Sequence, residues 1–94
     1  MAHTKSARKR IRQAEKRREI NRYHISRMKT AIKRIKEAIK KKDLETAVKL
    51  LPLAQKLAYR AAAKGAIHKN EARRRVSRIY KQVNELKKSL AEIN

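Results

Sequence analysis

Two clusters of basic residues contain the side chains of this 94-residue sequence that could do chemistry. The first basic cluster is formed by the Lys and Arg residues of the range 5–22. The second basic cluster comprises Lys69, Arg73, Arg74, Arg75, Arg78 and Lys81. Arginine binds phosphate oxygens through paired hydrogen bonds and lysine acts as a mobile point charge, so the mixture suits an irregular phosphate backbone. The sequence has 29 basic but only eight acidic residues, and the net charge of +21 therefore indicates a nucleic-acid-binding protein.

The remaining residue types provide little for other functions. With one Asp, one Gly, no Cys and no nucleophile suitably spaced from a base, the sequence argues against an enzyme and a small-molecule substrate. His3, His24 and His68 have no metal-like spacing, so we expect neither a metal nor another cofactor. The longest uncharged run, residues 50–55, is too short to span a membrane. Residues 1–30 have the composition of a mitochondrial transit peptide, but without a cleavage-like break we interpret them as part of the working protein.

The first basic cluster is expected on a long helix over about residues 5–41. The apolar residues that recur there at steps of three and four, on one helical stripe, are Ile25, Met28, Ile32, Ile35 and Ile39. Toward the N-terminus the same stripe is interrupted by polar residues and surrounded by basic ones. At about 1.5 Å per residue the helix would span roughly 55 Å, which is longer than the core of so small a domain requires. We therefore expect its first half to project into a partner.

A second helix is predicted over about residues 44–64. Asp43 can cap its start, and Gly65 can end it in the left-handed conformation. The apolar stripe of this helix consists of Leu44, Ala47, Val48, Leu51, Ala54, Ala58 and Ala61. The stripe continues through Pro52, so we expect a kink there; the alternative is two short helices, with Pro52 opening the second.

A third helix is predicted over about residues 68–92. Its heptad seam consists of Ala72, Val76, Ile79, Val83, Leu86, Leu90 and Ile93. Three helices with one apolar stripe each predict an all-α fold, an antiparallel three-helix bundle with a long, basic, projecting first helix, in a single domain over residues 1–94. A homodimeric coiled coil is the alternative. We expect the first and third helices to be antiparallel to each other, which places the basic clusters either at opposite ends or along one stripe.

A resemblance to a known family starts where the third helix begins. The residues that carry it are Lys64-Gly65-Ala66-Ile67-His68-Lys69-Asn70, then Ala72, Arg74, Arg75, Ser77, Arg78 and Ile79. This pattern resembles the signature of the S-twenty family of bacterial small-subunit ribosomal proteins. The N-terminal residues similar to the opening of that family are Lys5-Ser6-Ala7-Arg8-Lys9-Arg10, Gln13, Glu15-Lys16-Arg17-Arg18 and Asn21. The resemblance covers nearly the whole chain and is most specific in the run from Lys64 to Asn70.

The chain departs from the family pattern at two places. The usual Gly-Asp turn appears here as Lys42-Asp43, and Glu71, Arg73 and Val76 stand where a basic residue, Ala and Lys are usual. Val76 nevertheless completes the apolar seam, and Glu71 suits a helix N-terminus.

The resemblance implies a structural component of the small ribosomal subunit in the cytoplasm. It implies binding to 16S rRNA, in the 5′ domain and beside the long stem near the 3′ end, and support of assembly together with other components of the subunit. The positions that match the family pattern imply RNA contact for Lys5, Arg8, Lys9, Arg10, Lys16, Arg17, Arg18, Arg22, His68, Lys69, Asn70, Arg74, Ser77 and Arg78.

Other interpretations stay open at this point. Asn70 can cap the third helix instead of touching RNA. Tyr23, Tyr59 and Tyr80 are scattered, so we expect partial burial rather than base stacking. A DNA-architectural or other non-specific nucleic-acid-binding protein is the alternative function, because phosphate contacts carry no sequence information. A membrane-surface helix would need Trp or Phe anchors, and the chain has neither.

Overall fold

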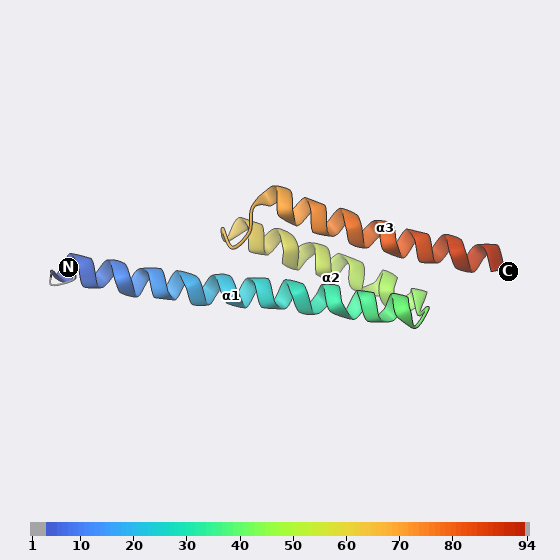
Figure 1. Cartoon of the computed structure of the whole chain (residues 1–94), viewed down its shortest axis with the longest axis horizontal. Helices are drawn as coiled ribbons and strands as arrows, with labels where there is room; N and C mark the ends of the chain where they lie inside the picture. The colour runs from blue at the N-terminus through green and yellow to red at the C-terminus, as the bar shows by residue number, and fades with distance from the viewer. Residues whose placement is uncertain (1–3, 94) are drawn as a thin grey trace.

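The computed structural model describes residues 4–93, apart from the side chain of Ile93. Three helices make up nearly all of this part: α1 (Lys5–Lys40), α2 (Leu44–Ala63) and α3 (Lys69–Ile93). Consecutive helices run in opposite directions, and α2 lies between α1 and α3 (Figure 1). The described residues contain no strand, and among them no helix is long and apolar enough to cross a membrane. The prediction of an all-α antiparallel bundle with a long, projecting first helix is confirmed.

Only the second half of α1 takes part in the bundle. The buried residues of this helix are Met28, Ala31, Ile32, Ile35 and Ala38. In the first half, Ile11 and Ile20 are half-exposed, and the helix continues past the ends of α2 and α3 (Figure 1). The described chain is accordingly elongated, with extents of 69, 21 and 17 Å. The start of α1 is fixed locally, because the Ala7 backbone N–H donates to the Thr4 hydroxyl over 3.2 Å.

The central helix α2 buries a broader face than one stripe. Ala47, Ala58 and Ala61 are almost fully buried, since small side chains let two neighbouring helices approach closely. Leu57 is also buried, with 6% exposed, although the predicted stripe omits it. The prediction that Val48 belongs to the stripe is wrong, because Val48 lies about 100° around the helix from Ala47 and is 48% exposed. Contacts on two sides of α2 therefore decide which of its residues form the core.

The helix α2 continues without interruption through Pro52. The alternative of two short helices is therefore wrong, whereas a kink at Pro52 stays a prediction. Proline has no backbone N–H, so the carbonyl of Val48 lacks its usual helical donor. Both Pro52 and Val48 are exposed, which lets water bind that carbonyl and keeps the cost of the proline low.

The same C-terminal motif ends α1 and α2. Lys42 has φ 58° and Gly65 has φ 76°, and each follows the helix by two residues. In both turns the next residue donates its N–H back into the last turn of the helix, Asp43 to Ala38 O over 2.8 Å and Ala66 to Ala61 O over 2.9 Å. The predicted left-handed Gly65 is confirmed, and Lys42 adopts the same conformation although it carries a Cβ.

The start of α2 is capped by Asp43, as predicted. One carboxylate oxygen of Asp43 accepts the Thr46 backbone N–H over 3.2 Å, and the other accepts the Thr46 hydroxyl over 2.6 Å. These two hydrogen bonds, the hydroxyl bond first, lower the pKa of Asp43 below its ordinary value. The carboxylate form thus holds the turn between α1 and α2.

The heptad seam of α3 faces the other helices. Ala72, Val76, Ile79, Val83 and Leu86 are buried, as predicted. Leu90 is half-buried, and the side chain of Ile93 lies outside the described part.

The helices α1 and α3 run in the same direction (Figure 1). The expectation that they are antiparallel is wrong, because two reversals of direction return the chain to its original course. The start of α3 lies beside the middle of α1, so the two basic clusters follow one another along the long axis of the molecule instead of occupying opposite ends (Figure 1).

Candidate nucleic-acid interface

The first basic cluster surrounds the projecting half of α1. Its members, all exposed, are Lys5, Arg8, Lys9, Arg10, Arg12, Lys16, Arg17, Arg18 and Arg22. At about 100° per residue these side chains leave no gap wider than about 80° around the helix. The neighbouring Glu15 and Glu19 make no ion pair with any described residue. The projecting half therefore presents positive charge in every direction.

Most of the second basic cluster lies on the face of α3 away from its buried seam, whereas Arg75 is half-buried at the edge of the seam. Asn70, Arg74, Ser77 and Arg78 are exposed and fall on this outer face. Lys69 is exposed at the helix start. Every residue for which RNA contact was expected is thus accessible to a large ligand.

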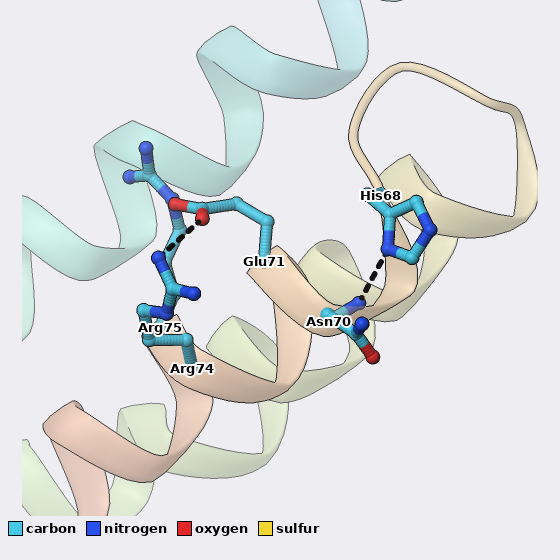
Figure 2. Close-up of polar contacts among 5 residues, drawn as sticks. All are labelled: His68, Asn70, Glu71, Arg74 and Arg75. Atoms are coloured by element: carbon cyan, nitrogen blue, oxygen red, sulfur yellow. Dashed lines mark hydrogen bonds and ion pairs between the residues drawn. The ribbon is translucent and has the colours of Figure 1, made fainter.

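His68 caps α3, as Figure 2 shows. Its Nδ1 accepts the Asn70 backbone N–H over 3.1 Å, and its carbonyl oxygen accepts the Ala72 N–H over 3.1 Å. The interpretation of Asn70 as the cap is wrong, because the helix begins at Lys69 and Asn70 is already its second residue. Because Nδ1 accepts this hydrogen bond, the proton of the neutral ring lies on Nε2. Nε2 is turned away from α3 (Figure 2). Nε2 can therefore donate to a phosphate while the ring still caps the helix.

Glu71 contacts two arginines of the second cluster (Figure 2). Its carboxylate accepts from Arg75 Nε over 3.0 Å and from Arg74 Nη1 over 3.5 Å. The longer contact involves a mostly exposed arginine and contributes little to stability. Arg75 is half-buried and fixed in direction, whereas Arg74 can turn to another acceptor at little cost.

A groove lies between α1 and α3, and two members of the second basic cluster, Arg75 and Arg78, line it. Its volume is about 250 Å³, and the residues that line it are Ile32, Lys36, Glu71, Arg75, Arg78, Ile79 and Gln82. Lys36 and Gln82 stood in none of the predicted sites. Their proximity depends on how α3 rotates against α1, for which the sequence gives no signal.

The three tyrosines differ in their surroundings. Tyr80 is half-buried and donates its hydroxyl hydrogen to Gln55 Oε1 over 2.8 Å, so the expected partial burial is confirmed there. The expectation is wrong for Tyr23 and Tyr59, which are 55% and 42% exposed. Tyr23 lies where α1 leaves the bundle. The guanidinium of Arg27, one turn further along α1, lies 5.5 Å from its ring centroid and donates to its hydroxyl over 3.2 Å.

The described residues contain no group of three or more His, Cys, Asp or Glu side chains that could hold a metal ion. His24 belongs to α1 and His68 to the start of α3. His3 lies outside the described residues.

Comparison with known proteins places nearly the whole chain in one group. A family model described as ribosomal protein S20 matches residues 2–84. The small ribosomal subunit protein bS20 of Persephonella marina is 82% identical over 92 residues, which cover 98% of this chain and 100% of that protein. The protein of the same description from Hydrogenobaculum sp. is 55% identical, and the match covers 89% of this chain and 90% of that protein. The one from Aquifex aeolicus is 46% identical, and the match covers 89% of each chain.

Proposed function

Because the chain belongs to the ribosomal protein S20 family, we propose that it is a structural component of the bacterial small ribosomal subunit. The family consists of ribosomal proteins and not of enzymes, in agreement with the sequence analysis. In this proposal residues 1–94 act as one rRNA-binding domain in the cytoplasmic ribosome. The domain binds 16S rRNA in the 5′ domain and beside the long stem near the 3′ end, and it supports assembly with the other components of the subunit.

The observation that carries this proposal is the charge around the projecting half of α1. A helix that lies on a single RNA surface needs basic residues on one face only. Here the nine exposed Lys and Arg residues of the first basic cluster point in all directions, on a segment that leaves the bundle (Figure 1). Such a segment can neutralise phosphates on opposite sides at once, which is what contact with two separate parts of an rRNA requires.

The second basic cluster supports the same function on the bundle itself. Arg74, Ser77 and Arg78 offer two guanidinium groups and a hydroxyl on one exposed face, and Nε2 of His68 lies at the start of that helix. Guanidinium groups bind phosphates in a bidentate manner, and a helix N-terminus adds a favourable dipole for an anion. We propose contacts from both clusters to the rRNA backbone.

A salt series with two competitors tests the proposed function. The full-length protein would be titrated in filter binding with a transcript of the 16S 5′ domain and with duplex DNA of similar length. We expect a log-log slope of affinity against salt with a magnitude of about four or more, because each phosphate contact releases counterions. We also expect preference for the folded RNA. A slope near zero would refute the phosphate mechanism, and equal affinity for DNA would favour the non-specific alternative.

A further inference from the structure

The groove between α1 and α3 lies at the least extensive contact of the bundle. The helix α2 packs against both neighbours, while α1 and α3 touch each other over a short stretch only. Ile32 of α1 and Ile79 of α3 are buried and form the floor of the groove. Polar side chains line its rim, so an occupant would meet charged groups from two helices that are distant in sequence.

The rim carries an excess of positive charge. Lys36 comes from α1 and Arg75 and Arg78 come from α3, whereas Glu71 is the one carboxylate among the lining residues. Like charges on facing helices repel each other and oppose the contact between α1 and α3. An anion in the groove would reverse this effect, because it would attract the charged groups of both helices.

One arginine is already oriented for such an anion. Glu71 accepts from Nε of Arg75 over 3.0 Å, which fixes the guanidinium plane while the donors on its two terminal nitrogens make no hydrogen bond to a described residue. Figure 2 shows this arginine extending from α3 toward the ribbon of α1. The remaining rim donors are the Lys36 ammonium, the Arg78 guanidinium and the Gln82 amide. A tetrahedral oxyanion with several acceptor oxygens matches this donor set.

We propose that the groove binds a phosphate group of the RNA backbone and thereby clamps α1 to α3. This inference rests on the proposed function for the identity of the ligand. It adds a site across two helices formed by Lys36, Arg75 and Arg78, in which Arg78 stands at the edge between the groove and the outer face of α3. Binding of the phosphate also stabilises the bundle, because a ligand that binds only the folded state shifts the unfolding equilibrium.

The first experiment uses inorganic phosphate as the probe. Melting of the full-length protein would be followed by circular dichroism while chloride is replaced by phosphate at constant ionic strength. The groove variant is Lys36→Gln/Arg75→Gln/Arg78→Gln. The matched control is Lys33→Gln/Arg73→Gln/Lys81→Gln, which removes the same charge from exposed positions outside the groove.

We expect the melting temperature of the parent and of the control to rise by roughly 7 °C for each tenfold increase of phosphate above its dissociation constant. The groove variant should show a clearly smaller rise, limited to the part that phosphate causes without binding in the groove. Phosphate also stabilises proteins without binding to a site. Equal shifts in all three proteins would therefore overturn the inference.

The second experiment asks whether the phosphate comes from RNA. The groove variant should bind a 16S 5′-domain transcript about tenfold more weakly than the control, beyond the loss that equal charge removal causes. Equal affinity of groove variant and control would show that RNA does not occupy the groove, and would overturn the inference. Absence of RNA binding by the parent, together with an intact phosphate shift, would instead contradict the proposed function.

A measurement on the unmodified protein keeps the inference testable if the groove variant does not fold. Phosphate would be titrated into isotope-labelled parent protein at constant ionic strength, and the amide and side-chain resonances would be followed by NMR. Saturable shifts at Lys36, Arg75 and Arg78 are expected. Shifts that are absent there, or equal over all basic residues, would refute a site in the groove.

Discussion

The left-handed Lys42 predicts that one glycine substitution stabilises the protein. Lys42 has φ 58° in the turn after α1, and Gly65 occupies the corresponding place after α2. The Cβ of a residue in this conformation approaches its own backbone, an interaction that glycine lacks. Lys41 stands directly before it with φ −82° and ψ −1°, a conformation that every residue adopts easily. Lys42→Gly and Lys41→Gly therefore remove the same charge from the same helix end, but only the first relieves strain.

The expected magnitude follows from two opposing terms. The left-handed conformation costs a residue with a Cβ about 1–2 kcal/mol. The greater freedom of glycine in the unfolded chain offsets about 0.5–1 kcal/mol of the gain. Lys42→Gly should thus raise the free energy of unfolding by about 0.5–1 kcal/mol, whereas Lys41→Gly should lower it by about the same amount. For a protein of this size the melting temperatures of the two variants should differ by roughly 8 °C.

Thermal and urea unfolding of the free protein, followed by circular dichroism, would measure both variants beside the parent. Loss of a lysine near a helix C-terminus weakens a favourable interaction with the helix dipole, and this effect is common to both variants. The reasoning would be refuted if Lys42→Gly melted at or below the temperature of Lys41→Gly.

Three further predictions concern α3, the turn at Asp43 and the projecting half of α1. Arg74→Ala/Arg78→Ala should reduce the magnitude of the salt slope of RNA binding by about two and change the melting temperature little. Leu86→Ala should instead lower the free energy of unfolding by on the order of 2 kcal/mol. Similar melting of both variants would contradict the assignment of the two faces of α3. Asp43→Asn should destabilise the protein at neutral pH. The difference in free energy of unfolding between variant and parent, measured with urea, should shrink as the pH falls through the lowered pKa of Asp43, because the carboxylate stabilises only while ionised. A difference that is independent of pH would refute the cap. The backbone amides of residues 8–18 should exchange hydrogen rapidly in the free protein and slowly with RNA, since these residues are exposed and their like charges repel. Strong protection from exchange without RNA would show that this half of α1 is stable alone.

How far the fold could be predicted depended on the number of neighbours of each helix. The seam of α3 follows a strict repeat because that helix buries one narrow face, and every described member from Ala72 to Leu86 is buried. The helix α2 contacts a neighbour on each of two sides, so a single stripe could not describe it. Leu57 was missed and Val48 was wrongly included for this reason.

The candidate site was predictable where it depends on charge and unpredictable where it depends on packing. Lysine and arginine on a helix without an apolar stripe must lie in solvent, and the exposure of the first basic cluster agrees with this. The cap formed by His68 and the position of Lys36 beside Arg75 depend on where α3 begins and how it is rotated. Neither the start of α3 nor its rotation produces a repeating pattern in the sequence.

The central position of α2 has a consequence for the order of events during synthesis. Because α1 and α3 touch so little, nearly all tertiary contacts join helices that follow each other in the chain. The hairpin of α1 and α2 can therefore form before α3 has been translated, and α3 can then add to a surface that already exists. Contacts between neighbours in sequence also favour rapid folding, on the microsecond to millisecond scale that is common for helical bundles. The nascent chain would accordingly need only short-range searches, and the basic half of α1 emerges before α2 and α3.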